Sequence, residues 1–392
     1  MPLKILVIPD KFKGTLSAEA AAQAIARGWH RSRPRDRLDL LPMSDGGDGF
    51  GEVMCELGNC KVQKATTVDA AHRPCVAPWW WKSGTKTAII ESARVIGLAM
   101  LPPGEFHPFV LDSFGMGALF LAAQRKGAKQ CLVGIGGSAT NDGGFGLARA
   151  MGWRFLDRTG NAIERWPELQ RLEVICSPSK QSQSGIGVLA GAPYPCRQNR
   201  PPSLDYSIEV AVDVQNPLLG PRGATRVYGP QKGLRPEDFK LAESCLSRMA
   251  TIWRRDFGKD LSTKPGAGAA GGLGFGLLAF LGAHLAPGFD LFAEHAGMED
   301  RLDWANLVIT GEGSIDKSTL MGKGVGQIAS RCLKRKIPCI GLAGFVTSSA
   351  RGAGTFETAR GLTELTSVAE AKSKPTYWLE RLAAQVAGEI KT

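Results

Sequence analysis

Residues 131–146 read CLVGIGGSATNDGGFG, and this stretch decides the fold class. An apolar run at 131–135 gives way to a loop of glycines and small polar residues, and a helix-compatible apolar pattern resumes at 147–151. This succession predicts a strand, a glycine-rich loop and a helix. Glycine lets a backbone approach a bound group closely, and the amides of such a loop attract anions. The loop is therefore a candidate phosphate site, in which Asp142 is placed to hold a cation.

The same order of strand, polar loop and helix recurs along the chain, for example at 3–8 and at 307–310. The carboxyl ends of parallel strands meet at one edge of a sheet, so we expect the loops that follow them to share a cleft. Acids stand beside glycines in several of these loops, and lysines occupy similar positions: Asp45, Asp48, Asp142, Asp213, Glu312 and Asp316, with Lys11, Lys13, Lys232 and Lys323.

Length and composition narrow the class of protein. A chain of 392 residues favours two domains. The net charge of +11 comes from Lys and Arg residues spread among acids without a nucleic-acid-binding motif, so we expect small anions rather than nucleic acid as partners. No apolar run could span a bilayer, and nine cysteines without a C-x-x-C pair are typical of scattered thiols in a reducing cytoplasm. The Ser-, Pro- and Arg-rich segment 157–205 predicts a surface loop.

Glycine loops, several acids and a few lysines are the components of phosphoryl transfer. Carboxylates hold Mg²⁺, lysines face phosphates, and one carboxylate takes the proton of the acceptor hydroxyl. Neither a G-x-x-x-x-G-K-[ST] motif nor the protein-kinase signature set is present. Gly266, Gly268 and Gly271 form a G-x-G-x-x-G, but the polar segment before them cannot be the strand that a dinucleotide fingerprint requires. The residues alone thus indicate a two-domain α/β protein that binds a phosphorylated ligand with a metal.

Seven segments stand in an order that resembles the bacterial type I glycerate kinase family: PDKFKGTLSA at 9–18, SDGGDGF at 44–50, GIGGSATNDGG at 134–144, DVQNPLLGPRGA at 213–224, YGPQKG at 228–233, PGAGAAGGLG at 265–274 and VITGEGSID at 308–316. The resemblance implies ATP- and Mg²⁺-dependent phosphorylation of D-glycerate, at the 2-hydroxyl, to 2-phosphoglycerate and ADP. It also implies two α/β domains. Residues 1–72 with 292–392 would form a flavodoxin- or Rossmann-like domain whose parallel sheet uses both chain ends. Residues 73–291 would form an inserted mixed α/β domain, with the active site in the cleft between the two.

Roles can then be assigned to the residues of these segments. We assign catalysis to Lys13, Asp45, Asp213 and Asp316. Substrate and phosphate binding is assigned to Lys11, Gly136, Gly137, Ser138, Thr140, Asn141, Asn216, Lys232 and Gly268. Metal binding is assigned to Asp142, Asp213 and Glu312. Which aspartate is the base and which bind metal stays open, and a helix cap or a turn is the alternative for each acid.

Departures from the family pattern leave other functions open. The family usually has Ser at Lys11, Thr at Phe50, Thr at Met116 and Arg at Ser314. Losing hydroxyls and an arginine around a polar site favours a kinase for another small hydroxy acid as the first alternative. A nicotinamide-dependent dehydrogenase and a non-catalytic ligand sensor are the alternatives outside that class. The sequence does not fix the oligomeric state and leaves a homodimer open.

Overall fold

The computed structural model describes residues 2–178, 204–320, 324–351 and 354–390. The chain divides into two compact units, one formed by Met1–Asp45 with Phe289–Thr392 and the other by Gly46–Gly288. Each unit is described by itself below. Lys323 and the latter part of the predicted surface loop, residues 179–203, lie outside the described residues.

A parallel sheet forms the centre of the first unit, as predicted. Its order is β13-β12-β11-β1-β2, with bounds Thr358–Gly361, Cys339–Val346, Leu307–Ile315, Lys4–Pro9 and Arg37–Leu40. Apolar residues fill β1 and are buried on both faces, which suits a central parallel strand. The chain order reverses between β1 and β11, so the carboxyl ends of these two strands mark the topological switch point of the sheet.

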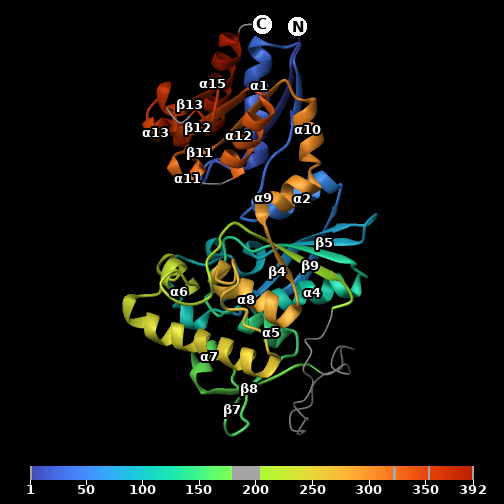
Figure 1. Cartoon of the computed structure of the whole chain (residues 1–392), viewed down its shortest axis with the longest axis vertical. Helices are drawn as coiled ribbons and strands as arrows, with labels where there is room; N and C mark the ends of the chain where they lie inside the picture. Colours follow the sequence, from blue (N-terminus) through green and yellow to red (C-terminus); the bar gives the residue numbers. More distant parts are fainter. Residues whose placement is uncertain (1, 179–203, 321–323, 352–353, 391–392) are drawn as a thin grey trace. The chain divides into compact units, whose positions relative to one another are not determined.

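Helices α1 (Ala18–Ser32) and α15 (Pro375–Glu389) lie side by side in this unit (Figure 1). Their backbones approach closely at Gly28, where a Cβ atom would stand 2.2 Å from the carbonyl oxygen of Glu380. The carboxylate of Glu380 binds Arg27 and Arg31 at 2.6 Å each. The remaining helices of the unit are α9 (Gly288–His295), α10 (Met298–Trp304), α11 (Lys317–Leu320), α12 (Gly324–Arg335), α13 (Ser348–Arg351) and α14 (Val368–Ser373).

The second unit contains a mixed six-stranded sheet in the order β10-β9-β6-β5-β4-β3. Strands β10, β9, β6 and β5 run parallel to one another. Strand β4 pairs antiparallel with β5, and β3 pairs antiparallel with β4. Their bounds are His284–Pro287, Ser207–Val212, Gln130–Gly134, Thr87–Glu91, Pro74–Lys82 and Lys61–Val68. Its main helices are α2 (Phe50–Gly58), α3 (Ala93–Ile96), α4 (Met116–Arg125), α5 (Phe145–Ala150), α6 (Ala224–Tyr228), α7 (Phe239–Phe257) and α8 (Ala269–Leu281). The strand and helix expected on either side of the 135–144 loop are β6 and α5.

The unit boundaries differ from the predicted domain limits. The first junction falls between residues 45 and 46, not between 72 and 73, because β3 pairs along its whole length with β4. Helix α2 packs on the same strand, since a Cβ atom on Gly51 would lie 1.9 Å from the Trp80 ring. The second junction, between 288 and 289, stands close to the predicted one at 291/292.

Two further expectations need correction. Residues 157–178 are not all loop, because the 3-10 helix η3 (Trp166–Arg171) precedes strand β8 (Leu172–Cys176), which pairs with β7 (Arg154–Asp157). Trp166 is buried and its Nε1 donates to the carbonyl oxygen of Leu111 at 3.1 Å. Free thiols include the buried Cys131 and Cys332, as predicted, but Cys176 is disulfide-bonded. Among the described helices, none is both long and apolar enough to cross a membrane.

Candidate active site

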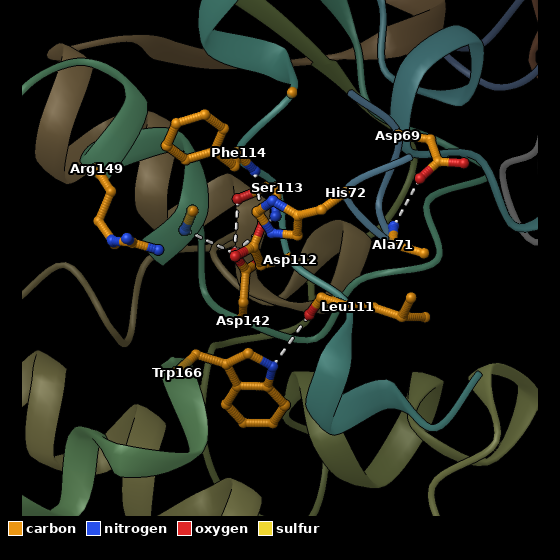
Figure 2. A network of polar contacts seen from close by, with 12 residues as sticks. Asp69, Ala71, His72, Leu111, Asp112, Ser113, Phe114, Asp142, Arg149 and Trp166 are labelled. Carbon is orange, nitrogen blue, oxygen red and sulfur yellow. Dashed lines mark hydrogen bonds and ion pairs between the residues drawn. The ribbon is translucent and has the colours of Figure 1, made fainter. Parts of the chain in front are cut away.

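The buried carboxylate of Asp142 holds the loop between β6 and α5. One oxygen, Oδ2, accepts hydrogen bonds from the backbone N–H of Ser113 (2.9 Å), the hydroxyl of Ser113 (2.7 Å) and the N–H of Gly146 (2.8 Å). The other, Oδ1, accepts from the N–H of Gly144 at 3.2 Å. Burial, followed by the charge of Asp112, raises the pKa of Asp142, and these hydrogen bonds oppose that shift. The structure thus places this predicted metal ligand inside a closed set of donors (Figure 2).

The segment that carries Ser113 is itself anchored. Asp112 Oδ1 lies 3.0 Å from His72 Nε2 and accepts the N–H of Phe114 at 2.9 Å. The hydrogen bond with Asp112 raises the pKa of His72. The hydroxyl oxygen of Ser113 also accepts the N–H of Leu147 at 2.9 Å, in α5. Figure 2 shows this chain of contacts from His72 through Asp112 and Ser113 to Asp142.

Lys232 reaches the same loop from a different segment. Its side chain is buried, and Nζ donates to the carbonyl oxygen of Thr140 at 2.6 Å and to Ser138 Oγ at 3.0 Å. The Ser138 hydroxyl in turn donates to the carbonyl oxygen of Ala270 at 3.1 Å. Burial lowers the pKa of Lys232 to about 7, and the negative charge of Asp142 opposes this shift. Three predicted binding residues, Ser138, Thr140 and Lys232, therefore lie together.

Two adjacent side chains of this loop are buried with polar atoms that lack partners. Asn141 donates through Nδ2 to Thr225 Oγ1 at 3.2 Å, but its Oδ1 has no hydrogen-bond partner among the described residues. The same holds for Thr140 Oγ1 within the described part of the chain. A buried polar atom without a partner costs free energy, on the order of 1–3 kcal/mol, so a native structure keeps one where a ligand or water can satisfy it.

The glycine-rich stretch before and within α8 passes close to the loop between β6 and α5. Ala270, Gly271 and Gly272 have φ angles of 55°, 70° and 87°. A Cβ atom on Gly271 would lie 1.9 Å from the carbonyl oxygen of Thr140, and on Gly268 it would lie 2.2 Å from that of Pro217. The G-x-G-x-x-G is thus a site of backbone crossing, and turns rather than a strand precede it, as predicted.

A second glycine loop, from the SDGGDGF segment, lies against the first. Gly136 donates its N–H to the carbonyl oxygen of Gly46 at 3.1 Å, and a Cβ atom on Gly137 would lie 2.1 Å from Asp48 Oδ1. Glu91 anchors this loop by accepting the N–H groups of Gly49 (3.1 Å) and Gly51 (2.9 Å). Sequence reasoning missed Glu91, although an acid that ends a buried strand is a recognisable signal.

Asp213 and Asn216 follow β9 in the same unit. Asp213 is exposed, and Asn216 Oδ1 accepts the hydroxyl of Tyr228 at 2.7 Å. Asn216 Nδ2 donates to the carbonyl oxygen of Arg222 at 2.7 Å, which closes the turn before α6. Burial and then the charge of Asp213 raise the pKa of Tyr228 to about 12.

In the first unit, acids gather at the switch point of the parallel sheet. Asp10 follows β1 directly, and burial followed by the charge of Asp45 raises its pKa to about 7, with Glu312 adding to the shift. Its Oδ1 accepts the N–H of Lys11 at 2.7 Å. Asp45 and Glu312 were predicted, but Asp10 was missed; its signal was an acid placed immediately after a buried parallel strand.

The other predicted residues of this unit are more dispersed. Asp316 Oδ1 accepts the N–H (2.7 Å) and hydroxyl (2.6 Å) of Ser318, which caps α11. Glu312 Oε1 accepts the hydroxyl of Thr319 at 2.6 Å, and Lys13 is exposed. Within the described ranges, no three His, Cys, Asp or Glu side chains converge as a ready metal site.

Comparison with known proteins identifies the family. Residues 5–391 match the model of the "Glycerate kinase family". The chain belongs to the glycerate kinase family. It is 33% identical to a glycerate kinase of Bacillus subtilis (strain 168) over 99% of this chain and 98% of that protein. It is 37% identical to the glycerate 2-kinase of Escherichia coli (strain K12) over 88% of this chain and 86% of that protein.

A solved structure of the glycerate kinase family has the same fold. A crystal structure described as a candidate glycerate kinase 2 from Salmonella typhimurium LT2 superposes with a TM-score of 0.79 at 32% sequence identity. The match covers 99% of this chain and 98% of the other. The predicted α/β class and the family resemblance are thereby confirmed.

Proposed function

We propose that this member of the glycerate kinase family transfers a phosphoryl group from ATP to the 2-hydroxyl of D-glycerate, in the cytoplasm, giving 2-phosphoglycerate and ADP. The family match over residues 5–391 supports the reaction class, and the similarity to a glycerate 2-kinase supports the position. The observation in the structure that carries the proposal is the pair of unpartnered buried atoms, Thr140 Oγ1 and Asn141 Oδ1, on a glycine-rich loop after a parallel strand. Such a loop supplies polar groups to a ligand that arrives at the carboxyl edge of the sheet.

The carboxylates of the first unit fit Mg²⁺, which prefers oxygen ligands. Asp10, Asp45 and Glu312 interact electrostatically, and the raised pKa of Asp10 records their mutual repulsion as well as its burial. A divalent cation would relieve that repulsion, so we assign Asp45 and Glu312 to the metal and add Asp10. Because these side chains do not converge on one point in the described structure, binding would have to draw them together. When bound, Mg²⁺ would neutralise charge on the transferred phosphate. Asp213 keeps its place as a further candidate ligand or as the base.

The remaining roles follow from the surroundings of each residue. Asp316 caps α11, so we favour Asp213, which is exposed at the end of β9, as the group that holds the proton of the acceptor hydroxyl. Lys11 and Lys13 lie in the loop after β1 and would face anionic groups of the substrates. Gly136 and Gly137 keep the backbone free of side chains where phosphate approaches.

The alternative functions receive less support. Phe50 and Met116, whose departure from the family pattern favoured another hydroxy acid, are fully buried side chains. Phe50 packs on Gly134, where a Cβ atom would stand 2.6 Å from its ring, and Met116 belongs to the core of the six-stranded sheet. A dehydrogenase would need a strand before the G-x-G-x-x-G, and that segment forms turns.

An assay of the purified protein with D-glycerate, ATP and Mg²⁺, followed by phosphorus NMR, tests the proposal. We expect ADP and 2-phosphoglycerate in equal amounts. Formation of 3-phosphoglycerate would overturn the assigned position, and absence of ADP formation would overturn the kinase.

The role of Asp213 is tested separately. We expect Asp213→Asn to lower kcat by about 10²–10⁴-fold, the range for removal of a general base. Asp157, which also ends a strand of the same unit, is the matched control, and Asp157→Asn should leave kcat unchanged. An unchanged rate in Asp213→Asn would transfer the role to Asp316.

A further inference from the structure

The loop between β6 and α5 is held by two buried residues of opposite charge, Asp142 and Lys232. We propose that these are positioning residues, neither a metal ligand nor a direct phosphate contact, and that Thr140 and Asn141 between them are the side chains that meet the substrate. The inference rests on the proposed kinase function and assigns the roles within its phosphate loop.

The contacts and the burial of Asp142 together argue against a metal. Each carboxylate oxygen offers about two lone-pair positions; Oδ2 receives three hydrogen bonds and Oδ1 receives one, so a single position on Oδ1 is left. The side chain is fully buried, so a metal ion at that position would have to enter the space beside the donors that hold Gly144, Gly146 and the Ser113 segment. The carboxylate therefore acts on the loop, through the backbone amides of Gly144 and Gly146.

Lys232 fixes the other side of the same loop. Two of its three N–H groups are used by the carbonyl oxygen of Thr140 and by Ser138 Oγ. Nζ also lies beside Gly271, where a Cβ atom would stand 2.8 Å from it, so the side chain fits here only because residue 271 is glycine. The amino group of Lys232 thus ties Ser138 and Thr140 to the turn that precedes Gly233, and the negative charge of Asp142 favours its charged form.

Between these anchors, the partners of Thr140 and Asn141 are incomplete. The backbone of Thr140 is held by Lys232 while its hydroxyl has no partner in the described chain, and the same is true of Asn141 Oδ1. An anchored backbone that carries side chains without partners is typical of a pre-organised binding site. The loop is already ordered before the ligand binds, so binding loses little conformational entropy.

The anchoring extends outward from Asp142. Ser113 contributes both of its donors to Asp142, and Asp112 beside it is paired with His72 near the surface (Figure 2). Ser113 is fully buried behind Asp142 and does not contact a substrate itself. We therefore expect any kinetic effect of changing Ser113 to act through the loop that Asp142 holds. This gives a test that does not depend on altering the carboxylate itself.

The test uses Asp142→Asn and Ser113→Ala in the full-length protein, with kcat, KM and the Mg²⁺ concentration for half-maximal rate measured for each. Calorimetric titration with ATP gives a readout besides turnover. We expect both variants to lose about tenfold to a hundredfold in kcat/KM, because each disturbs a hydrogen bond to a charged group that sets the loop geometry. The Mg²⁺ requirement should not change. Asp142→Asn combined with Ser113→Ala should cost less than the product of the two single effects.

The opposite results would overturn the proposal. A raised Mg²⁺ requirement in Asp142→Asn would make Asp142 a metal ligand, and a wild-type kcat/KM in Ser113→Ala would remove the positioning role. If Asp142→Asn does not fold, Ser113→Ala decides alone, because it keeps the backbone donor. Thr140→Val should weaken ATP or glycerate binding without loss of melting temperature. Asn141→Ala should weaken binding as well and should lower the melting temperature, because it breaks the buried hydrogen bond to Thr225. Unchanged affinity for both ligands would contradict the role of either residue.

A matched control separates stability from positioning. Asp36 is also a buried carboxylate, accepting the N–H of Leu3 (2.9 Å) and Trp29 Nε1 (3.0 Å), but it belongs to the other unit and to no proposed site. Asp36→Asn should lower the melting temperature and leave kcat/KM unchanged. Absence of kinase activity in the wild type would refute the proposed function itself, whereas the present inference fails only if an active wild type and its variants behave alike.

Discussion

At the scale of the residue, Asp10 combines burial with acidic neighbours. Its pKa of about 7 exceeds the ordinary 3.8 because burial, then Asp45 and Glu312, disfavour the charged form. The native state therefore keeps this proton when the unfolded chain has lost it. The free energy of unfolding therefore falls as pH rises from about 4 to about 7, and the full destabilisation by charged Asp10 is present above that range.

Asp10→Asn removes this cost. In EDTA, we expect the variant to be more stable than the wild type by on the order of 1–2 kcal/mol at pH 8, and nearly equal to it at pH 4. Urea denaturation at both pH values measures the difference. With Mg²⁺ present the wild type should gain melting temperature and the variant should gain less, together with a loss of kinase activity. A pH-independent difference would refute the assigned cause.

Asp36→Asn provides a control of opposite sign. Although burial opposes it, the hydrogen bond from Arg33 gives Asp36 a pKa below its usual value. A carboxyl with a lowered pKa contributes stability above its unfolded pKa and loses it as pH falls. We therefore expect Asp36→Asn to be less stable than the wild type at pH 8, the reverse of Asp10→Asn.

Sequence reasoning could predict some residues of the candidate site and not others, for a physical reason. The loop residues Ser138, Thr140, Asn141 and Asp142 were predicted because they follow an apolar strand within one short segment. Their contacts could not be predicted, since Lys232 and Ser113 come from segments far away along the chain. The departures from the family pattern at Phe50 and Met116 favoured a changed acceptor pocket, but both side chains are buried in the structure.

At the scale of the element, the packing of α1 on α15 depends on Gly28. A Cβ atom there would lie 2.2 Å from the backbone carbonyl oxygen of Glu380, which cannot move without shifting a helix. We expect Gly28→Ala to destabilise the protein by about 1–3 kcal/mol through overpacking, despite the better helix propensity of alanine. Denaturant unfolding measures this difference.

Gly388 in α15 is the matched control for Gly28. A Cβ atom at this position would have nothing within 4 Å. Gly388→Ala should leave stability unchanged or raise it by up to about 1 kcal/mol, because only helix propensity changes. Equal effects of the two substitutions would show that the close approach of α1 and α15 is not what matters.

Elements with a local sequence signal were predictable, and those defined by distant pairing were not. An apolar run ending in glycine located β6 and the loop after it. In contrast, β7 and β8 pair across the 3-10 helix at Trp166, in a segment whose serines and prolines suggested only loop. The glycines of 266–272 were visible, but their function of letting backbones cross depends on Thr140 and Pro217.

At the scale of the whole molecule, the chain forms one continuous and one discontinuous unit. Because 46–288 contains its own six-stranded sheet and core clusters, we expect this fragment to fold alone and to melt cooperatively, without kinase activity. Residues 1–45 alone should stay unfolded, since β1 would lack β11. Circular dichroism and amide NMR spectra test both fragments, and a disordered 46–288 would contradict the division.

The fold class and the family could be predicted from the sequence. The apolar strands followed by polar loops and helices indicate the fold class, and the ordered motifs indicate the family. The first boundary was misplaced because a domain limit reflects which strands pair, and the partner of β3 is β4, beyond the predicted limit at residue 72. The pattern of polar and apolar residues along the chain does not indicate which strands will pair.

The pairing of β1 with β11 has a consequence for synthesis on the ribosome. Ile5 is opposite Leu307, so after synthesis β1 waits for its central neighbour while some three hundred residues are translated. At about 5–20 residues per second this delay lasts on the order of tens of seconds. Meanwhile the residues of β1 that become buried remain exposed, and the inserted unit can fold first. We therefore expect the nascent β1 segment to be open during this interval to chaperones that bind extended apolar segments.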